Sequence, residues 1–339
     1  MRHKATSTTF YPFFERAKLR HSNSSLLLER RVVDISSERS YAKTSAAIAE
    51  HYNVDLPTSA IRKITNTTCQ AAKEFNANVK NSAQKADTIV AQMDGSMIPI
   101  VAYGEATQEQ KAAGLKKDRH CHWREARLCT ASIPNNGKKL YGVVLGSPLK
   151  AGCMMSKTCQ QIGMDIDTYI HGVGDGAVWI ADQYEIQFGL NHDYYLDFYH
   201  VCEYLAEASK AITQNKNNSS GLTFSQWLSL AKKRLKEGES QALIDELKAE
   251  SNEFDPECVI AKAHQYLNNR IGHLNYPKAL QAGLPIGSGE VESGHRSVLQ
   301  ARLKKPGAWW SVEYAENMAH LKVLQENNHW EEFWAQKAA

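Results

Sequence analysis

The 339-residue sequence lacks several patterns that assign a protein to a class directly. No stretch approaches the roughly eighteen consecutive apolar residues that a transmembrane helix needs. No apolar segment follows the basic start MRHKATSTTF, so we expect no signal peptide. The glycines of GVGDG match neither the dinucleotide-binding nor the P-loop fingerprint. These absences argue against an integral membrane protein, a secreted protein and a nucleotide-binding enzyme.

Cysteine is present without an arrangement that indicates chemistry. The seven cysteines are scattered and contain no CxxC pair. Structural zinc sites usually contain such closely spaced pairs, and an odd, scattered set is typical of reduced thiols. We therefore expect a cytoplasmic protein without a structural zinc site.

Positive charge is concentrated in two regions. Residues 1–80 contain 13 Lys and Arg against 7 Asp and Glu, whereas the remainder contains 27 basic and 30 acidic residues. Residues 293–312 contain no acidic residue and four basic ones, Arg296, Arg302, Lys304 and Lys305. Two basic regions suit a polyanionic partner such as DNA. An ordinary solvated surface explains the composition alone equally well.

The N-terminal part indicates helices. Residues 1–31 mix aromatic and basic residues without periodicity, and we expect a partly ordered arm there. Residues 40–75 predict two helices separated by YNVDLP, with Ser40 capping the first helix and Thr58 or Ser59 the second. The second helix would expose Arg62 and Lys63. This is the outline of a DNA-binding helix-turn-helix, although a plain helical hairpin fits as well.

The central part predicts a mixed sheet. Apolar runs begin at Thr88, Trp123, Leu140, Tyr169 and Tyr194, and amphipathic segments follow the third, fourth and fifth runs. The predicted order is β-β-β-α-β-α-β-α, which indicates an α/β (mixed) fold with helices on the faces of the sheet. A strongly helical block, residues 222–280, separates this sheet from GLPIGSGEVESGHRSVLQARL.

Acidic residues at strand ends are the candidates for chemistry. Asp94 and Asp175 each follow an apolar run and precede glycine, and a third acid lies in GSGEVES. If the strands that end at Asp94 and Asp175 are neighbours, the two carboxylates meet at one edge of the sheet and suit a hard divalent cation. Three carboxylates can hold two Mg²⁺ ions for phosphoryl transfer. A single Asp-Gly pair is, however, most often only a turn.

Several motifs in a fixed order resemble a known family. GDGAVWI, DFYHVCEYL, PIGSGEVES, RLKKPGAWW and NNHWEEFW, with the helical block between them, resemble the ribonuclease H-like DDE transposases of bacterial insertion sequences. More narrowly, they are similar to the group related to the Mutator and hAT elements, which has a Cys/Asp-x-x-His signature, here DFYH. The likeness covers roughly residues 25–335, and the shared order makes it more specific than one motif alone.

The resemblance implies roles for individual residues. Asp94 and Asp175 match the first two metal-binding carboxylates, and Glu292 matches the third, although Glu290 is also a candidate. Asp197 and His200 match the signature and would support the site, with Asp197 capping the helix that follows. The implied cofactors are two Mg²⁺ or Mn²⁺ ions. Residues that would contact DNA are Arg62, Lys63, Arg296, Arg302, Lys304 and Lys305.

The resemblance also implies an organisation and an activity. We expect a DNA-binding arm and helix-turn-helix in residues 1–85, the first part of a ribonuclease H-like core in 86–215, a helical insertion in 216–283, and helices completing the core in 284–339. The implied function is cleavage of double-stranded DNA at transposon ends and strand transfer into target DNA, by a homodimer or higher oligomer in the bacterial cytoplasm, near the nucleoid and without membrane contact. A catalytically inactive DNA-binding descendant and a nuclease without strand transfer remain as alternatives.

Overall fold

The computed structural model describes residues 24–338, apart from 83, 106–107, 109–111, 116, 215–220 and 252–257. Its contacts divide the chain into two compact units. Residues 81–95 and 127–294 form one, which we call the sheet unit. Residues 1–80, 96–126 and 295–339 form the other, the terminal unit. The predicted four-part division of the chain stays a prediction.

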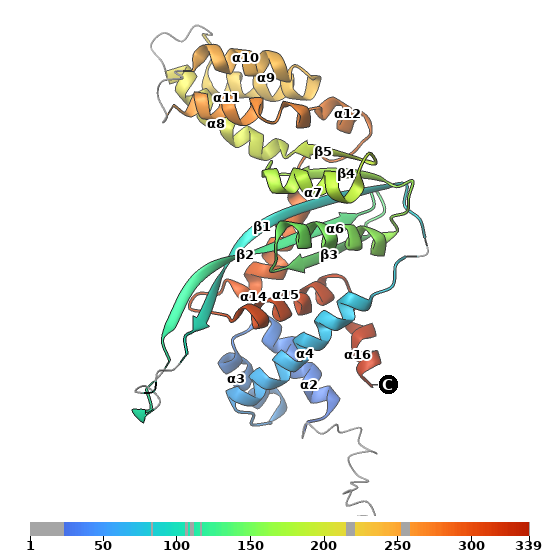
Figure 1. The fold of residues 1–339 in the computed structure, drawn as a ribbon, viewed down its shortest axis with the longest axis vertical. Coiled ribbons are helices and arrows are strands. Elements are labelled where there is room, and N and C mark those ends of the chain that lie inside the picture. Colours follow the sequence, from blue (N-terminus) through green and yellow to red (C-terminus); the bar gives the residue numbers. More distant parts are fainter. Residues whose placement is uncertain are drawn as a thin grey trace, which may run out of the picture. The chain divides into compact units, whose positions relative to one another are not determined.

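The sheet has five strands in the order β3-β2-β1-β4-β5 (Figure 1). They are β1 (Thr88–Tyr103), β2 (Arg119–Ser132), β3 (Lys139–Val144), β4 (Tyr169–Gly174) and β5 (His192–Leu196). β4 is parallel to both β1 and β5, whereas β2 is antiparallel to β3. The predicted mixed α/β fold is therefore confirmed, and it is consistent with the ribonuclease H-like fold that the motifs imply.

Helices cover both faces of the parallel part of the sheet. Side chains of α6 (Pro148–Ile162) and α7 (Val178–Phe188) share a core with Ile89, Ala91 and Ile170 of β1 and β4. Val173 and Leu196 belong to a second core, formed with helices that follow β5. Because alternate residues of a strand point to opposite faces, a strand covered on both faces reads as a continuous apolar run. This explains why β4 has the sequence YIHGVG.

The helical insertion packs as a bundle of its own around this second core. α8 (Phe198–Gln214) precedes the insertion and shares this core. The insertion itself contains α9 (Phe224–Glu237), α10 (Ser240–Glu250), α11 (Val259–Asn268), the short 3-10 helix η1 (Ile271–His273) and α12 (Tyr276–Gln281). Thr223 and Gln226 form a reciprocal capping box at the start of α9, a strong local helix signal. α13 (Gly289–Gly294) then ends the sheet unit.

β1 is longer than its sequence predicts. The apolar run TIVAQMD suggested a strand that ends in a turn at Asp94-Gly95, but the strand continues to Tyr103. The continuation is paired, because Val101 N donates to Trp310 O at 2.8 Å and Trp310 N donates to Pro99 O at 3.3 Å. The expectation of an Asp-Gly turn at Asp94 is therefore wrong. The segment that completes the pairing is distant in sequence, so local patterns do not reveal it.

The terminal unit combines helices from both ends of the chain. α2 (Leu26–Glu38), α3 (Tyr41–Tyr52) and α4 (Thr58–Asn78) enclose a small core of Val32, Ile48 and Ile61. From the other end come the π-helical segment η2 (His295–Gln300), α14 (Ala301–Leu303), α15 (Val312–Glu326) and α16 (Trp330–Ala338). α15 packs along α4, and Lys73 of α4 forms an ion pair with Glu316 of α15 at 2.6 Å.

Local predictions in this unit have mixed outcomes. Ser40 caps α3 as predicted, its hydroxyl accepting from Lys43 N at 3.4 Å. α4 begins at Thr58 after Pro57 and has no side-chain cap, so neither Thr58 nor Ser59 caps it. The arm predicted for residues 1–31 ends earlier, because Ser25 caps α2 and residues 26–31 are helical. Residues 1–23 lie outside the described part of the chain.

Two observations bear on the class of protein. Among the described helices, none has both the length and the apolarity required to cross a membrane. None of the seven cysteines, all of which lie in the described part of the chain, forms a disulfide.

The close approach of α7 to β4 makes a stability prediction. A Cβ at Gly172 would lie 2.5 Å from Cε1 of Tyr184, whose hydroxyl donates to Ala91 O at 2.6 Å. Gly172→Ala should therefore lower the free energy of unfolding by about 1–3 kcal/mol, because the buried ring has no room to move. Gly272→Ala is the matched control, since a Cβ there meets nothing within 4 Å. Equal denaturation midpoints for the two variants would contradict this packing.

Candidate active site and DNA-binding surface

The strand register brings the two predicted aspartates to one level of the sheet. β1 and β4 are paired in parallel up to Gln92 and Val173. Asp94 and Asp175 each follow two residues later on these neighbouring strands. Both are partly exposed, although the residues before them are buried. The register thus places Asp94 and Asp175 at one level of the sheet, each directly after a buried residue.

A tight turn fixes Asp175. Its Oδ1 accepts a hydrogen bond from Ala177 N at 2.8 Å, so the side chain closes the turn that leads into α7. Gly176 has φ +82°, and its N–H donates to the Tyr194 hydroxyl at 3.1 Å. A side chain at Gly176 would be strained by this backbone and would collide with Leu196. The sequence Asp-Gly is therefore required by the turn that presents Asp175.

The two candidates for the third acid lie in different surroundings. Glu290 and Glu292 are both in the first turn of α13, and two residues along a helix correspond to roughly 200° of rotation. Glu290 Oε2 accepts from the Ser132 hydroxyl at 2.7 Å, which engages its carboxylate at the end of β2. Glu292 is exposed. This geometry favours Glu292 over Glu290.

These side chains fit a hard divalent cation by type more than by arrangement. Carboxylate oxygens are the ligands that Mg²⁺ and Mn²⁺ prefer. Asp94 and Asp175 supply them at one level of the sheet. Within the described ranges, however, no three His, Cys, Asp or Glu side chains are close enough to share one metal ion. The register therefore places two of the three predicted ligands on neighbouring strands, and α13 carries the third.

Every residue of the loop before α13 is held by a hydrogen bond. Pro285 O accepts from His171 Nε2 at 2.7 Å, Ile286 O accepts from Phe198 N at 2.8 Å, and Gly287 O accepts from Gln92 Nε2 at 3.2 Å. A carbonyl oxygen can only accept, so Nε2 of His171 carries the proton. Gly287 is needed because a Cβ there would lie 2.6 Å from the Tyr199 ring. The motif PIGSG thus describes a loop bound at each position.

Gln92 joins this loop to β1. It is 1% exposed, and its Oε1 accepts from Val291 N at 3.0 Å while its Nε2 donates to Gly287 O. The buried side-chain amide of Gln92, two residues before Asp94, therefore fixes the start of α13. Sequence reasoning missed Gln92, and the available signal was a polar residue inside the apolar run TIVAQMD.

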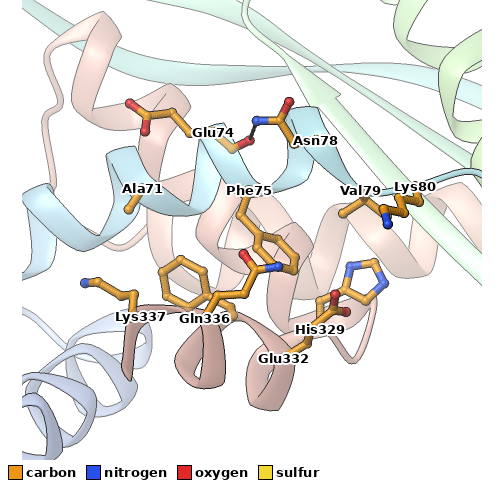
Figure 2. Close-up of a pocket in the computed structure, with 11 residues that line it drawn as sticks. Ala71, Glu74, Phe75, Asn78, Val79, Lys80, His329, Glu332, Gln336 and Lys337 are labelled. Carbon is orange, nitrogen blue, oxygen red and sulfur yellow. Dashed lines mark hydrogen bonds between the residues drawn. The ribbon is translucent and has the colours of Figure 1, made fainter. Parts of the chain in front are cut away.

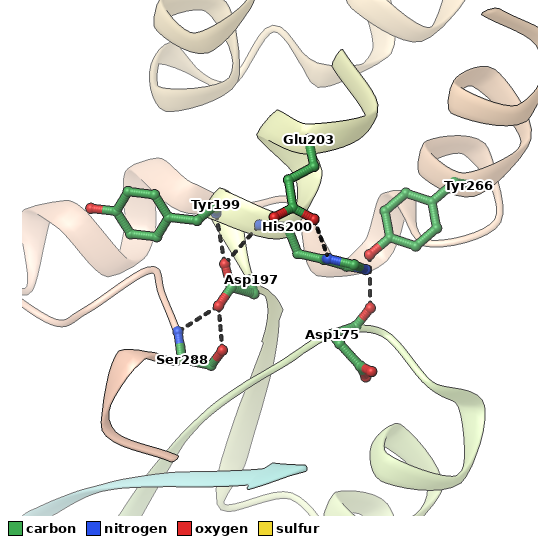
Figure 3. A network of polar contacts seen from close by, with 7 residues as sticks. All are labelled: Asp175, Asp197, Tyr199, His200, Glu203, Tyr266 and Ser288. Carbon is green, nitrogen blue, oxygen red and sulfur yellow. Dashed lines mark hydrogen bonds and ion pairs between the residues drawn. The ribbon is translucent and has the colours of Figure 1, made fainter. Parts of the chain in front are cut away.

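Asp197 is a buried carboxylate with four hydrogen bonds (Figure 3). Its Oδ1 accepts from Tyr199 N at 2.6 Å and His200 N at 3.0 Å, which confirms that it caps α8. Its Oδ2 accepts from the N–H of Ser288, at 2.6 Å, and from the Ser288 hydroxyl. Asp197 therefore joins β5, α8 and the loop before α13, and the structure gives it a positioning arrangement.

His200 lies in the first turn of α8 at the edge of this network. Its Nδ1 is 3.2 Å from Glu203 Oε2 (Figure 3). Its ring makes edge contacts with Tyr204 and Tyr266. The signature Asp-x-x-His thus places the two side chains on one helix start with separate partners. A direct role of His200 in the site stays a prediction.

The second helix of the predicted helix-turn-helix presents a polar groove. Arg62 and Lys63 are exposed on α4, and a cavity of about 440 Å³ separates this face from α15. The α4 side of the groove consists of polar or basic side chains, namely Ser59, Arg62, Lys63, Asn66, Thr67 and Gln70. These residue types contact phosphates and base edges in DNA complexes. Glu313 and Tyr314 of α15 form part of the opposite side.

The basic cluster near the C-terminus divides into exposed and buried residues. Arg296 is exposed, Lys305 is half-buried, and Lys304 Nζ donates to Ser96 Oγ at 2.6 Å. Arg302 is 3% exposed, its Nε donates to Ser36 O at 2.8 Å, and its guanidinium lies over the rings of Tyr41 and Trp310. Arg302 is therefore a structural residue inside the terminal unit, contrary to the predicted DNA contact. The sequence alone does not distinguish it from its basic neighbours.

A second cavity, of about 770 Å³, lies between the end of α4 and α16 (Figure 2). Phe75 and Phe333 form its apolar floor and meet edge to face, with ring centroids 5.6 Å apart. Glu74, Glu332, Lys80 and Lys337 place both signs of charge around it. None of the predicted site residues lines this cavity.

Comparisons with known proteins find similarity at the level of structure, and that similarity is distant. No family model matches the chain, and no curated protein matches it. Among solved structures, the chain is similar to the Drosophila P element transposase strand transfer complex, with a TM-score of 0.34 and 9% sequence identity. The match covers 96% of this chain and 83% of that one. At this level of similarity the comparison assigns neither family nor activity, and any assignment depends on the site itself.

The capping network around Asp197 predicts that Asp197→Asn keeps the hydrogen bonds to α8 but loses the one from the N–H of Ser288. Asn at position 197 can still cap α8 through its oxygen, but its NH₂ would face the N–H of Ser288. Asp197→Asn should lower the free energy of unfolding by about 1–3 kcal/mol, because a buried donor is left unsatisfied. Ser288→Ala, which removes only the hydroxyl bond, should cost less. A larger loss for Ser288→Ala in chemical denaturation would contradict the network.

Removal of the Arg302 side chain should lower the stability of the protein, whereas removal of the Lys305 side chain should leave it nearly unchanged. Arg302→Ala leaves the Ser36 carbonyl without its partner and removes packing against two rings, so we expect a loss of about 1–3 kcal/mol in stability. Lys305→Ala should change stability by less than about 0.5 kcal/mol. If Lys305 contacts a phosphate, its removal should also reduce the salt dependence of DNA binding. Denaturation curves and a salt titration of binding separate the two roles.

Proposed function

We propose that this protein is a DNA transposase that cleaves phosphodiester bonds at transposon ends and joins the ends to target DNA. One observation carries the proposal: Asp94 and Asp175 lie at the same level of neighbouring parallel strands, beside a helix that bears Glu292. Three carboxylates supported by a sheet and one helix suit phosphoryl transfer assisted by divalent cations. The ordered motifs of the resembling transposases support the same activity.

Asp94, Asp175 and Glu292 would hold two Mg²⁺ or Mn²⁺ ions. Bound cations would supply Lewis-acid stabilisation for the oxygen that attacks phosphorus and the oxygen that leaves. The contribution of the chain is to fix the carboxylates. The Asx turn fixes Asp175, and Gln92 with Asp197 fixes the loop that begins α13. Rigid support of this kind keeps the groups in a productive geometry.

Double-stranded DNA is the proposed partner, with the polar face of α4 as its contact in the terminal unit. Arg62 and Lys63 would contact phosphates, and the neighbouring polar side chains would contact base edges. Arg296, Lys304 and Lys305 provide further positive charge. Processing two transposon ends together would require a homodimer or a higher oligomer.

Removal of one catalytic carboxylate should abolish chemistry while DNA binding persists. The substrate is a plasmid that carries the DNA flanking both sides of the protein's own coding sequence, incubated with protein and Mg²⁺ or Mn²⁺. Asp94→Asn and Asp175→Asn should lower the rates of end cleavage and joining by at least about a hundredfold, the scale of losing a group that stabilises the transition state. Unchanged cleavage in either variant would refute the assignment.

The products distinguish the alternatives. A nuclease without strand transfer yields nicks and breaks but no joint molecules between a labelled end and target plasmid. An inactive DNA-binding descendant binds the flanking DNA and gives neither product with any cation.

Glu290 and Glu292 form a matched pair for the third carboxylate. Glu292→Gln should abolish cleavage with little change in stability, because its side chain is exposed. Glu290→Gln should retain most activity and slightly lower stability, because the Ser132 hydroxyl loses a charged acceptor. The reverse pattern of activity would identify Glu290 as the third carboxylate.

A further inference from the structure

We propose that Tyr266 and Arg270 of the helical insertion are positioning residues for the Asp175 carboxylate. The inference rests on the proposed function, because it assigns these residues a role in the same site. It gives the helical insertion a part in the chemistry of that site. Tyr266 lies in the last turn of α11, and Arg270 follows two residues after the end of that helix, next to the turn that contains Asp175.

Tyr266 binds the backbone of Asp175 itself. Its hydroxyl donates to Asp175 O at 2.7 Å, and Figure 3 shows the ring approaching Asp175 from the side opposite its carboxylate. A carbonyl oxygen can only accept, so the Tyr266 hydroxyl is the donor in this bond. Tyr204 of α8 stacks on this ring, with centroids 4.0 Å apart and planes at 8°.

Arg270 binds the next peptide of the same turn. Its Nε donates to Gly176 O at 2.8 Å, and its guanidinium lies over the Tyr266 ring, 4.4 Å from the centroid. Its Nη1 also donates to Tyr266 O at 3.2 Å. Arg270 occupies the space beside Gly176, where a Cβ would lie 2.6 Å from Nε. Two consecutive carbonyls of the Asp-Gly turn are therefore held by one side chain from the end of α11 and one from the residues that follow it.

These bonds control the direction of the Asp175 side chain. Asp175 lies beyond the last residue of β4, so the ladder of the sheet no longer fixes its carbonyl. Rotation of the peptide after Asp175 would move the Asx turn and with it the carboxylate. Tyr194 and Tyr266 bind the N–H and the C=O of the Asp175–Gly176 peptide, and Arg270 binds the C=O of the next peptide. The insertion thus supplies hydrogen bonds to the backbone at a point where the pairing of β4 has ended.

The test compares two hydroxyl deletions on stacked rings. Tyr266→Phe removes the bond to Asp175 and keeps the ring. Tyr204→Phe is the matched control, because in the described part of the chain its hydroxyl makes no contact with Asp175 or Gly176. Mn²⁺ binding is measured by calorimetry on the full-length protein, and DNA cleavage is measured alongside it. Tyr266→Phe should weaken Mn²⁺ binding and lower kcat about three- to tenfold, the factor equivalent to one hydrogen bond.

The expected pattern separates positioning from general stability. KM for DNA should stay unchanged in Tyr266→Phe, and Tyr204→Phe should match wild type in both metal binding and kcat. Arg270→Gln, as a second variant, should also weaken Mn²⁺ binding. Equal Mn²⁺ affinity and kcat for wild type, Tyr266→Phe and Arg270→Gln would overturn the positioning role alone. Wild-type protein that binds no Mn²⁺ would overturn the proposed function together with it.

Discussion

Burial of the Asp197 carboxylate is the constraint on which the rest of the sheet unit depends. A carboxylate that is 2% exposed is very costly unless donors surround it, and here they come from α8 and from Ser288. Satisfying this one charge fixes the loop after the insertion, and the loop in turn fixes the start of α13. After the insertion, the chain therefore returns to the sheet with α13 held in a fixed position.

The residues that determined the fold were locally readable. Apolar runs indicated the strands, and the order of strands and helices followed from the succession of apolar runs and amphipathic segments. DFYH marked a helix start because an Asp before a helix is a strong cap signal. Asp94 and Asp175 were found because each follows an apolar run and precedes glycine. In these places local chemistry and tertiary packing require the same residue.

Other features depended on contacts between distant segments. The extension of β1 needs Trp310, and the engagement of Glu290 needs Ser132, which are separated from their partners by more than a hundred residues. Arg302 has the same local context as Lys304 and Lys305, yet it is enclosed by Ser36 and Tyr41. Gln92 and Tyr266 carry no motif at all. Patterns along the chain report local preference, and these roles arise only when the chain has folded.

The composition of the terminal unit has a consequence for biosynthesis. α2 and α4, near the start of the chain, are completed by Arg302, Lys322 and Phe333, which the ribosome adds near the end. The early helices cannot bury these surfaces while the remaining chain is still being made. The face of α4 that bears Arg62 and Lys63 therefore reaches its final packing only after α15 has been made, and polypeptides that terminate before α15 lack a finished version of it.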